Sequence, residues 1–174
     1  MVRQIISIFL FLICFSVNAQ QYLAKDGTIS FFSKAPVEDI SAINNKVSAV
    51  YDAKTKALVF QLHIIDFIFS RFLMQEHFNE NYMESDIFPI STFVGKVISH
   101  KEGVANVEGE LTIHGETNII SVTGDLQVND NIASISAVRF SVKLKDYKIK
   151  VPRIVMYNIA EEIEIKVTIE MKKQ

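Results

Sequence analysis

Apolar and polar residues alternate with a period of two through the second half of the chain. The alternation covers residues 104–114, 117–129, 132–146 and 161–171. In the first of these segments, Val107 and Leu111 fall on one face and Glu108 falls on the other. Strands with one apolar and one polar face are typical of antiparallel sheets, because crossover helices would cover both faces of a parallel sheet. The pattern therefore predicts four long antiparallel strands.

Short polar turns separate these strands, so consecutive strands should pair as hairpins. The turns Lys101-Glu102-Gly103, His114-Gly115-Glu116 and Asn129-Asp130-Asn131 each contain a residue that tolerates a positive φ. Weaker patterns predict further strands near residues 28–33, 46–52, 57–67 and 90–99. We expect all eight to form an elongated all-β barrel, since closure removes exposed strand edges. A β-sandwich is the alternative.

The segment 70–82 interrupts the alternation between the third and fourth strands. Met74, Phe78 and Tyr82 recur at a spacing of four residues, and Ser70 is a suitable N-cap. This spacing predicts a short helix. A second helical turn is expected over Val37–Ile43, because Pro36 precedes it in a position that favours helix starts.

The amino terminus has the layout of a secretory signal peptide. Arg3 precedes an apolar stretch from Ile5 to Val17, and Ala19 stands at a suitable cleavage site. The stretch is shorter than the roughly 20 residues that span a bilayer, so we expect no stable membrane insertion. The prediction is a signal peptide over residues 1–19, one domain over 20–174, and a periplasmic or secreted protein without its only cysteine, Cys14.

Charge excludes some classes of partner. The chain has 18 Lys and Arg against 20 Asp and Glu, a formal net charge of −2, with no long basic run. Nucleic acid is therefore not expected as a partner.

Six segments that follow in order over most of the chain share one resemblance. They are residues 73–85, Phe88-Pro89, Phe93-Val94-Gly95, 109–115, 146–149 and Val151-Pro152. They resemble the YceI-like family, a group of lipocalin-like periplasmic proteins that bind polyisoprenoids. The early strands around Phe31-Phe32-Ser33 and Ile40 to Asn45 match the family pattern loosely. The resemblance implies an extended eight-stranded antiparallel barrel that holds a long amphiphile, such as an isoprenoid or another lipid, in its lumen.

Aromatic residues crowd the predicted helix and its flanks, and Met and Phe can adapt to irregular apolar ligands. Ordinary core packing beneath a helical lid is the alternative interpretation. The candidate ligand-binding residues of this group are Phe67, Phe69, Phe72, Met74, Phe78, Tyr82 and Phe93, with the inward-facing Leu111 and Phe140. His77 and Asn81, with Glu84, are candidates for contact with the polar head of an amphiphile.

Three glycines, Gly95, Gly109 and Gly124, occupy inward positions on neighbouring strands. Hairpin pairing predicts that they form one thin-walled patch beside the lumen. Such a patch can let the backbone bend at a barrel corner, or it can leave room for the short helix or for a ligand. The sequence leaves these alternatives open.

The histidines do not indicate catalysis. Only His77 lies among acidic residues, and no HExxH motif or paired histidine at metal-ligand spacing is present. We therefore expect no enzyme activity, no cofactor and no metal. The predicted function is a binding or carrier protein for a long apolar amphiphile. The alternative is a structural or interaction domain of the cell envelope with a filled lumen, and a homodimer stays open.

Overall fold

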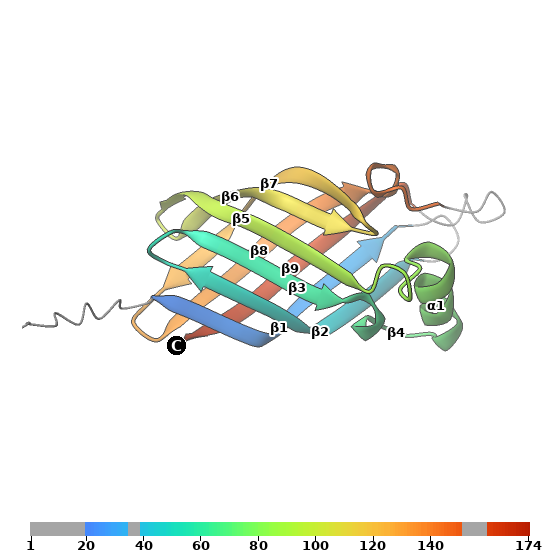
Figure 1. Cartoon of the computed structure of the whole chain (residues 1–174), viewed down its shortest axis with the longest axis horizontal. Coiled ribbons are helices and arrows are strands. Elements are labelled where there is room, and N and C mark those ends of the chain that lie inside the picture. The colour runs from blue at the N-terminus through green and yellow to red at the C-terminus, as the bar shows by residue number, and fades with distance from the viewer. Residues whose placement is uncertain (1–19, 35–38, 151–159) are drawn as a thin grey trace, which may run out of the picture.

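Long antiparallel strands surround one lumen in the computed structural model, which describes residues 20–34, 39–150 and 160–174 (Figure 1). The strands are β1 (Gln21–Ser33), β2 (Ile40–Asp52), β3 (Ala57–His63), β4 (Ile68–Phe69), β5 (Ile90–Lys101), β6 (Val104–Ile113), β7 (Glu116–Val128), β8 (Ile132–Lys143) and β9 (Glu162–Lys173). The helical elements are η1 (Ile64–Asp66), α1 (Phe72–His77), the π-helical turn η2 (Phe78–Tyr82) and η3 (Leu144–Tyr147).

The sheet closes on itself. Its strand order among the described residues is β1-β9-β8-β7-β6-β5-β3-β2-β4, and β1 also pairs with β2. Because β4 has two residues, eight strands make the wall. The predicted elongated antiparallel barrel is confirmed, with α1 and η2 between its third and fourth wall strands.

Several predicted boundaries were wrong. β1 begins at Gln21 and not near residue 28, and β8 ends at Lys143 because Leu144–Tyr147 form η3. The expected helical turn over Val37–Ile43 is a strand from Ile40 onward, since Ile40–Ile43 pair with β1 from Ser33 to Ser30. The third strand, expected over 57–67, ends at His63 because the chain turns into η1. The predicted signal peptide, residues 1–19, lies outside the described residues.

One end of the barrel is closed by tight packing. Tyr22 and Tyr51 stack there with ring centroids 6.2 Å apart, and the Tyr22 hydroxyl donates to the Asn129 carbonyl at 2.7 Å. Met171 and Ala133 are fully buried nearby in the β8–β9 pair. The helical elements α1, η2 and η3 lie at the opposite end, which we call the mouth (Figure 1).

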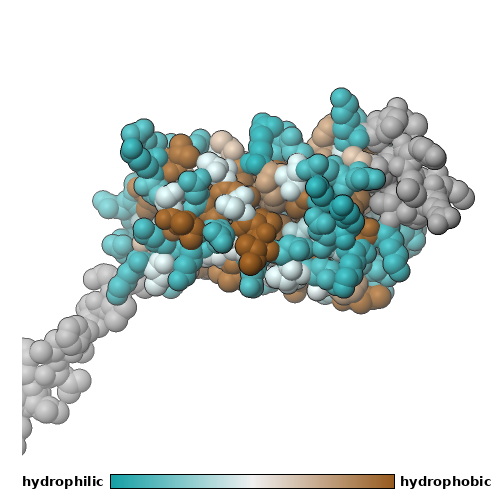
Figure 2. Space-filling model, turned by 90° about the horizontal axis from the view of Figure 1, so that it is seen from above, coloured by the Kyte–Doolittle hydropathy of each residue, from teal (hydrophilic) through white to brown (hydrophobic). Residues whose placement is uncertain are grey.

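The outer face of the wall is mostly polar but not uniformly so. Exposed apolar side chains on β5, β6 and β7 include Val94, Ile98, Val104 and Ile119. Figure 2 shows apolar atoms gathered among polar ones on the face seen from above. None of the described helices is long and apolar enough to cross a membrane.

Candidate functional site

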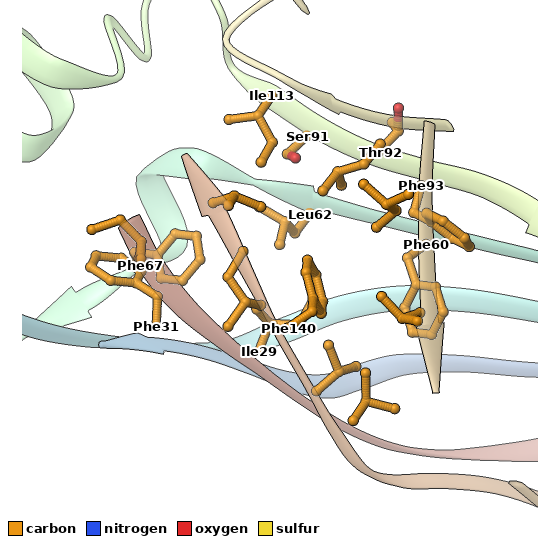
Figure 3. A pocket seen from close by; sticks show the side chains of 18 of the residues that line it. Ile29, Phe31, Phe60, Leu62, Phe67, Ser91, Thr92, Phe93, Ile113 and Phe140 are labelled. Carbon is orange, nitrogen blue, oxygen red and sulfur yellow. The ribbon is translucent and has the colours of Figure 1, made fainter. Parts of the chain in front are cut away.

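The inward-facing side chains do not fill the barrel, because they leave a cavity of about 220 Å³. Residues of every wall strand line this cavity, and almost all of them are apolar. Figure 3 shows Leu62, Phe93 and Phe140 directed into the shared space. An apolar cavity of about 150 Å³ can already bind benzene. The lumen therefore has room for an apolar guest.

Nine of the fourteen residues predicted as ligand contacts line the cavity. They are Phe67, Phe69, Met74, Phe78, Tyr82, Phe93, Leu111, Gly124 and Phe140. Phe72, His77, Asn81, Gly95 and Gly109 are not among the lining residues.

The mouth is packed with aromatic rings. Phe78 of η2 lies 5.5 Å from Phe31, 5.6 Å from Phe67 and 4.9 Å from Phe69, measured between ring centroids. Phe31 also contacts Phe67 at 5.3 Å and Phe69 at 5.7 Å. These four rings, the aromatic cluster, join the β1 wall to the segment that carries α1 and η2. We call that segment, residues 70–88, the lid.

Three of the predicted contacts lie on the outer side of the lid. Phe72 is 82% exposed, and His77 and Asn81 are exposed as well. The helix spacing was correct for Met74, Phe78 and Tyr82, which face inward. Phe72 and His77 lie on other faces of the same short helix, so the structure does not place them against a guest in the lumen.

Glu84 contacts His114 instead of serving the head-group site predicted beside His77. The His114 Nε2 atom lies 2.9 Å from a Glu84 carboxylate oxygen, and Nδ1 lies 3.3 Å from the Tyr147 carbonyl oxygen. The Phe88 ring packs on the imidazole with centroids 4.3 Å apart. Both ring nitrogens of His114 therefore face an oxygen acceptor. We call the contact between Glu84 and His114 the latch. Together with the His114–Tyr147 contact, it ties the lid to the β6–β7 turn and to η3.

The glycine patch is present only in part. Gly95 pairs directly with Gly109, but Gly109 pairs with Ile120 on β7, and Gly124 pairs with Ala105 instead. A Cβ on Gly95 or Gly109 would lie 2.6 or 2.7 Å from the Phe93 ring. The ring therefore occupies the space that the two glycines leave, which explains why neither lines the cavity.

Two polar groups of the lining are hydrogen-bonded within the protein. The Ser91 hydroxyl donates to the Thr112 carbonyl at 2.7 Å, and the Ser33 hydroxyl accepts from the Ala160 N–H at 3.2 Å. Burial raises the pKa of Tyr82, and it raises that of Tyr147 although the Asn118 amide opposes it. Burial is also the main cause of the raised pKa of Tyr51. Such groups can orient a guest but do not form an acid–base pair.

No cluster of three or more His, Cys, Asp or Glu side chains that could hold a metal occurs within the described residues.

Sequence reasoning missed much of the wall. Phe31, Phe60 and the lining residues of β9, such as Ile165, were not among the candidates, although all line the cavity. The alternation of β9 was recognised and could have supplied its residues. Phe31 and Phe32 are adjacent, so only the register decides that Phe31 faces inward while Phe32 is 37% exposed.

Comparison with known proteins decides the family. The family model described as YceI-like domain matches residues 17–171. The chain belongs to the YceI-like family. No curated protein matches this YceI-like chain in a sequence search.

Solved structures share the fold of this YceI-like barrel at low sequence identity. A polyisoprenoid binding domain from Saccharophagus degradans, implicated in plant cell wall breakdown, superposes with a TM-score of 0.75 at 10% identity, covering 90% of this chain and 99% of that one. BcnA of Burkholderia cenocepacia gives a TM-score of 0.73 at 16% identity, with 83% and 95% covered. The YceI protein of Campylobacter jejuni gives 0.67 at 16%, with 81% and 89% covered.

Proposed function

We propose that this protein is a non-enzymatic periplasmic binding or carrier protein that sequesters a long apolar amphiphile in its lumen. The observation that carries the proposal is the cavity of about 220 Å³ with an almost wholly apolar lining. An isoprenoid quinone, a polyprenol or a lipid chain would match both the chemistry and the elongation of this space.

Two further observations support the ligand class. A solved neighbour with the same fold is described as a polyisoprenoid binding domain. The lumen also has few polar groups, and two of these, Ser33 and Ser91, are already hydrogen-bonded. A polar substrate would therefore leave its own groups unpaired, which is costly in an apolar site.

The sequence of the amino terminus supports a periplasmic location. The layout of Arg3, the apolar stretch and Ala19 fits a cleaved signal peptide. Mass spectrometry of the protein recovered from its own cells tests this: we expect a mature chain that begins at Gln20.

Binding is tested by titration with a fluorescent polyene fatty acid and displacement by geranylgeraniol. Val107 lines the cavity, whereas the adjacent Glu108 is exposed on the outer face. We expect Val107→Trp to weaken binding at least tenfold because the indole fills the lumen, and Glu108→Trp to bind as the wild type does. Equal affinity of all three proteins, or no binding by the wild type, would overturn the proposal.

A further inference from the structure

The wall of the barrel is incomplete along one seam. β7 and β8 share four ladder pairs, from Asp125↔Ser136 to Val128↔Ala133. Above that point, residues 116–124 of β7 have ladder partners only on β6, and residues 138–143 of β8 have them only on β9, among the residues that the structure describes. We call this unpaired stretch the β7–β8 slot. At about 3.3 Å per residue, it is roughly 25 Å long.

A bulge in β8 separates the two strands. The register between β8 and β9 shifts between Ile135 and Val138, and Ala137 inside the shift has φ 55°. A bulge bends its strand and increases the twist, so β8 follows β9 and leaves β7 at this position. Alanine is unfavourable in the left-handed region because of its Cβ, and such outliers concentrate at functional positions.

The cavity lies directly behind the slot. Ile120, Val122 and Gly124 of β7 line it from one side, and Val138, Phe140 and Val142 of β8 line it from the other. The slot is bounded at the closed end by contact between Gly124 and the Val138 side chain. At the mouth end, the Asn118 amide donates to the Asp146 carbonyl at 2.8 Å, and Lys148 pairs with Glu116 at 2.8 Å.

The slot can open at lower cost than the neighbouring seams of β5, β6 and β7. Parting β5 from β6, or β6 from β7, would break ladders that run almost the whole strand length. Parting β7 from β8 along the slot breaks no ladder hydrogen bond. At the mouth end it loosens the Asn118–Asp146 hydrogen bond and the Glu116–Lys148 ion pair. Entry past the lid would require separation of the four rings of the aromatic cluster, each pair of which is stabilising.

We infer that the β7–β8 slot is the route by which the guest enters and leaves the lumen. The inference rests on the proposed function and adds a constraint on the ligand. A slender chain, straight or methyl-branched, passes sideways through a long narrow slot and lies down along the lumen, while the lid stays closed.

A covalent strap across the slot tests the route. Ser121 of β7 and Ser141 of β8 face each other across the slot, because each lies three residues from the contact between Gly124 and Val138, in the direction of the mouth. Both are exposed on the outer face. Ser121→Cys/Ser141→Cys in the mature chain, which lacks Cys14, is oxidised to a disulfide. In a second sample, a short bis-maleimide joins the two cysteines, which it can reach even where the strands are too far apart for a disulfide.

The matched control is a cross-link between two strands that are already hydrogen-bonded to each other. Ser99 and Asn106 are ladder partners on β5 and β6, and their side chains are hydrogen-bonded at 2.8 Å. Ser99→Cys/Asn106→Cys therefore adds a cross-link without closing any route.

Stopped-flow fluorescence with the polyene fatty acid gives the rates of entry and release. We expect the slot strap to slow both rates at least tenfold with little change in Kd, reductant to restore them in the disulfide sample, and the control strap to leave them unchanged. Wild-type rates in the strapped protein, or equal slowing by both straps, would overturn the inference. A wild-type protein that does not bind the probe would instead refute the proposed function.

Discussion

Removal of one ring from the aromatic cluster should loosen the lid. Phe78 belongs to the lid, and its ring contacts Phe31, Phe67 and Phe69 at centroid distances of 5.5, 5.6 and 4.9 Å. Phe78→Ala removes all three contacts at once. Because no other ring of the cluster comes from the lid, the substitution leaves the lid attached through Met74, Tyr82, the buried Met83 and the Glu84–His114 contact.

The size of the effect follows from burial and from the ring pairs. Truncation of a fully buried Phe costs about 3–5 kcal/mol, and each favourable ring pair contributes about 0.5–1.5 kcal/mol of interaction. Phe78 is only partly buried, so its transfer term is smaller than that of a core residue. We therefore expect Phe78→Ala to cost about 2–4 kcal/mol, concentrated in the lid.

Hydrogen exchange and denaturant unfolding measure this loss. Amides of residues 72–82 should exchange about 30-fold faster or more in Phe78→Ala, since about 2 kcal/mol corresponds to that factor. Phe72→Ala is the matched control on the same helix: Phe72 is 82% exposed, so its truncation should change stability by less than about 0.5 kcal/mol. Equal effects of the two substitutions would refute the packing argument.

Three further outcomes are expected. Gly109→Ala should destabilise the fold by about 1–3 kcal/mol in urea unfolding, because its Cβ would lie 2.5 Å from the backbone of Gly95. Glu84→Ala should cost about 1 kcal/mol and speed exchange of lid amides, whereas Glu164→Ala, which removes an exposed pair, should cost less than about 0.5 kcal/mol. Burial raises the pKa of three tyrosines in the native state, so the unfolded chain loses these protons at lower pH than the native chain. The free energy of unfolding should therefore hold below pH 10 and fall as the pH rises above it. Tyr→Phe variants should make this fall less steep. These tyrosines are Tyr51, Tyr82 and Tyr147.

The alternation of apolar and polar residues was sufficient to predict long antiparallel strands, and the barrel was preferred to a sandwich because closure removes exposed strand edges. A period of two over a dozen residues is incompatible with a helix, and short turns leave consecutive strands little choice of partner. The prediction of β6 and β7 was therefore close to the observed Val104–Ile113 and Glu116–Val128. The early chain was harder, because β2 begins with Ile40 just after a segment rich in residues that favour a helix start.

Predictions about the site depended on register, which alternation alone does not supply. The glycine patch shows this, since Gly124 lies opposite Ala105 and only Gly95 and Gly109 meet. The latch was not predictable for a related reason. Glu84 and His114 are 30 residues apart, and their contact exists only because the lid folds back onto the β6–β7 turn. The bulge at Ala137 carries no local sequence signal, since alanine rarely adopts a positive φ.

Native mass spectrometry of the mature protein, purified without detergent from the cells that make it, tests the central claim most directly. The account predicts a species heavier than the chain by the mass of one lipid-like molecule, which organic extraction removes and which Val107→Trp does not carry. A protein of bare chain mass that also binds no polyene fatty acid or geranylgeraniol would contradict it.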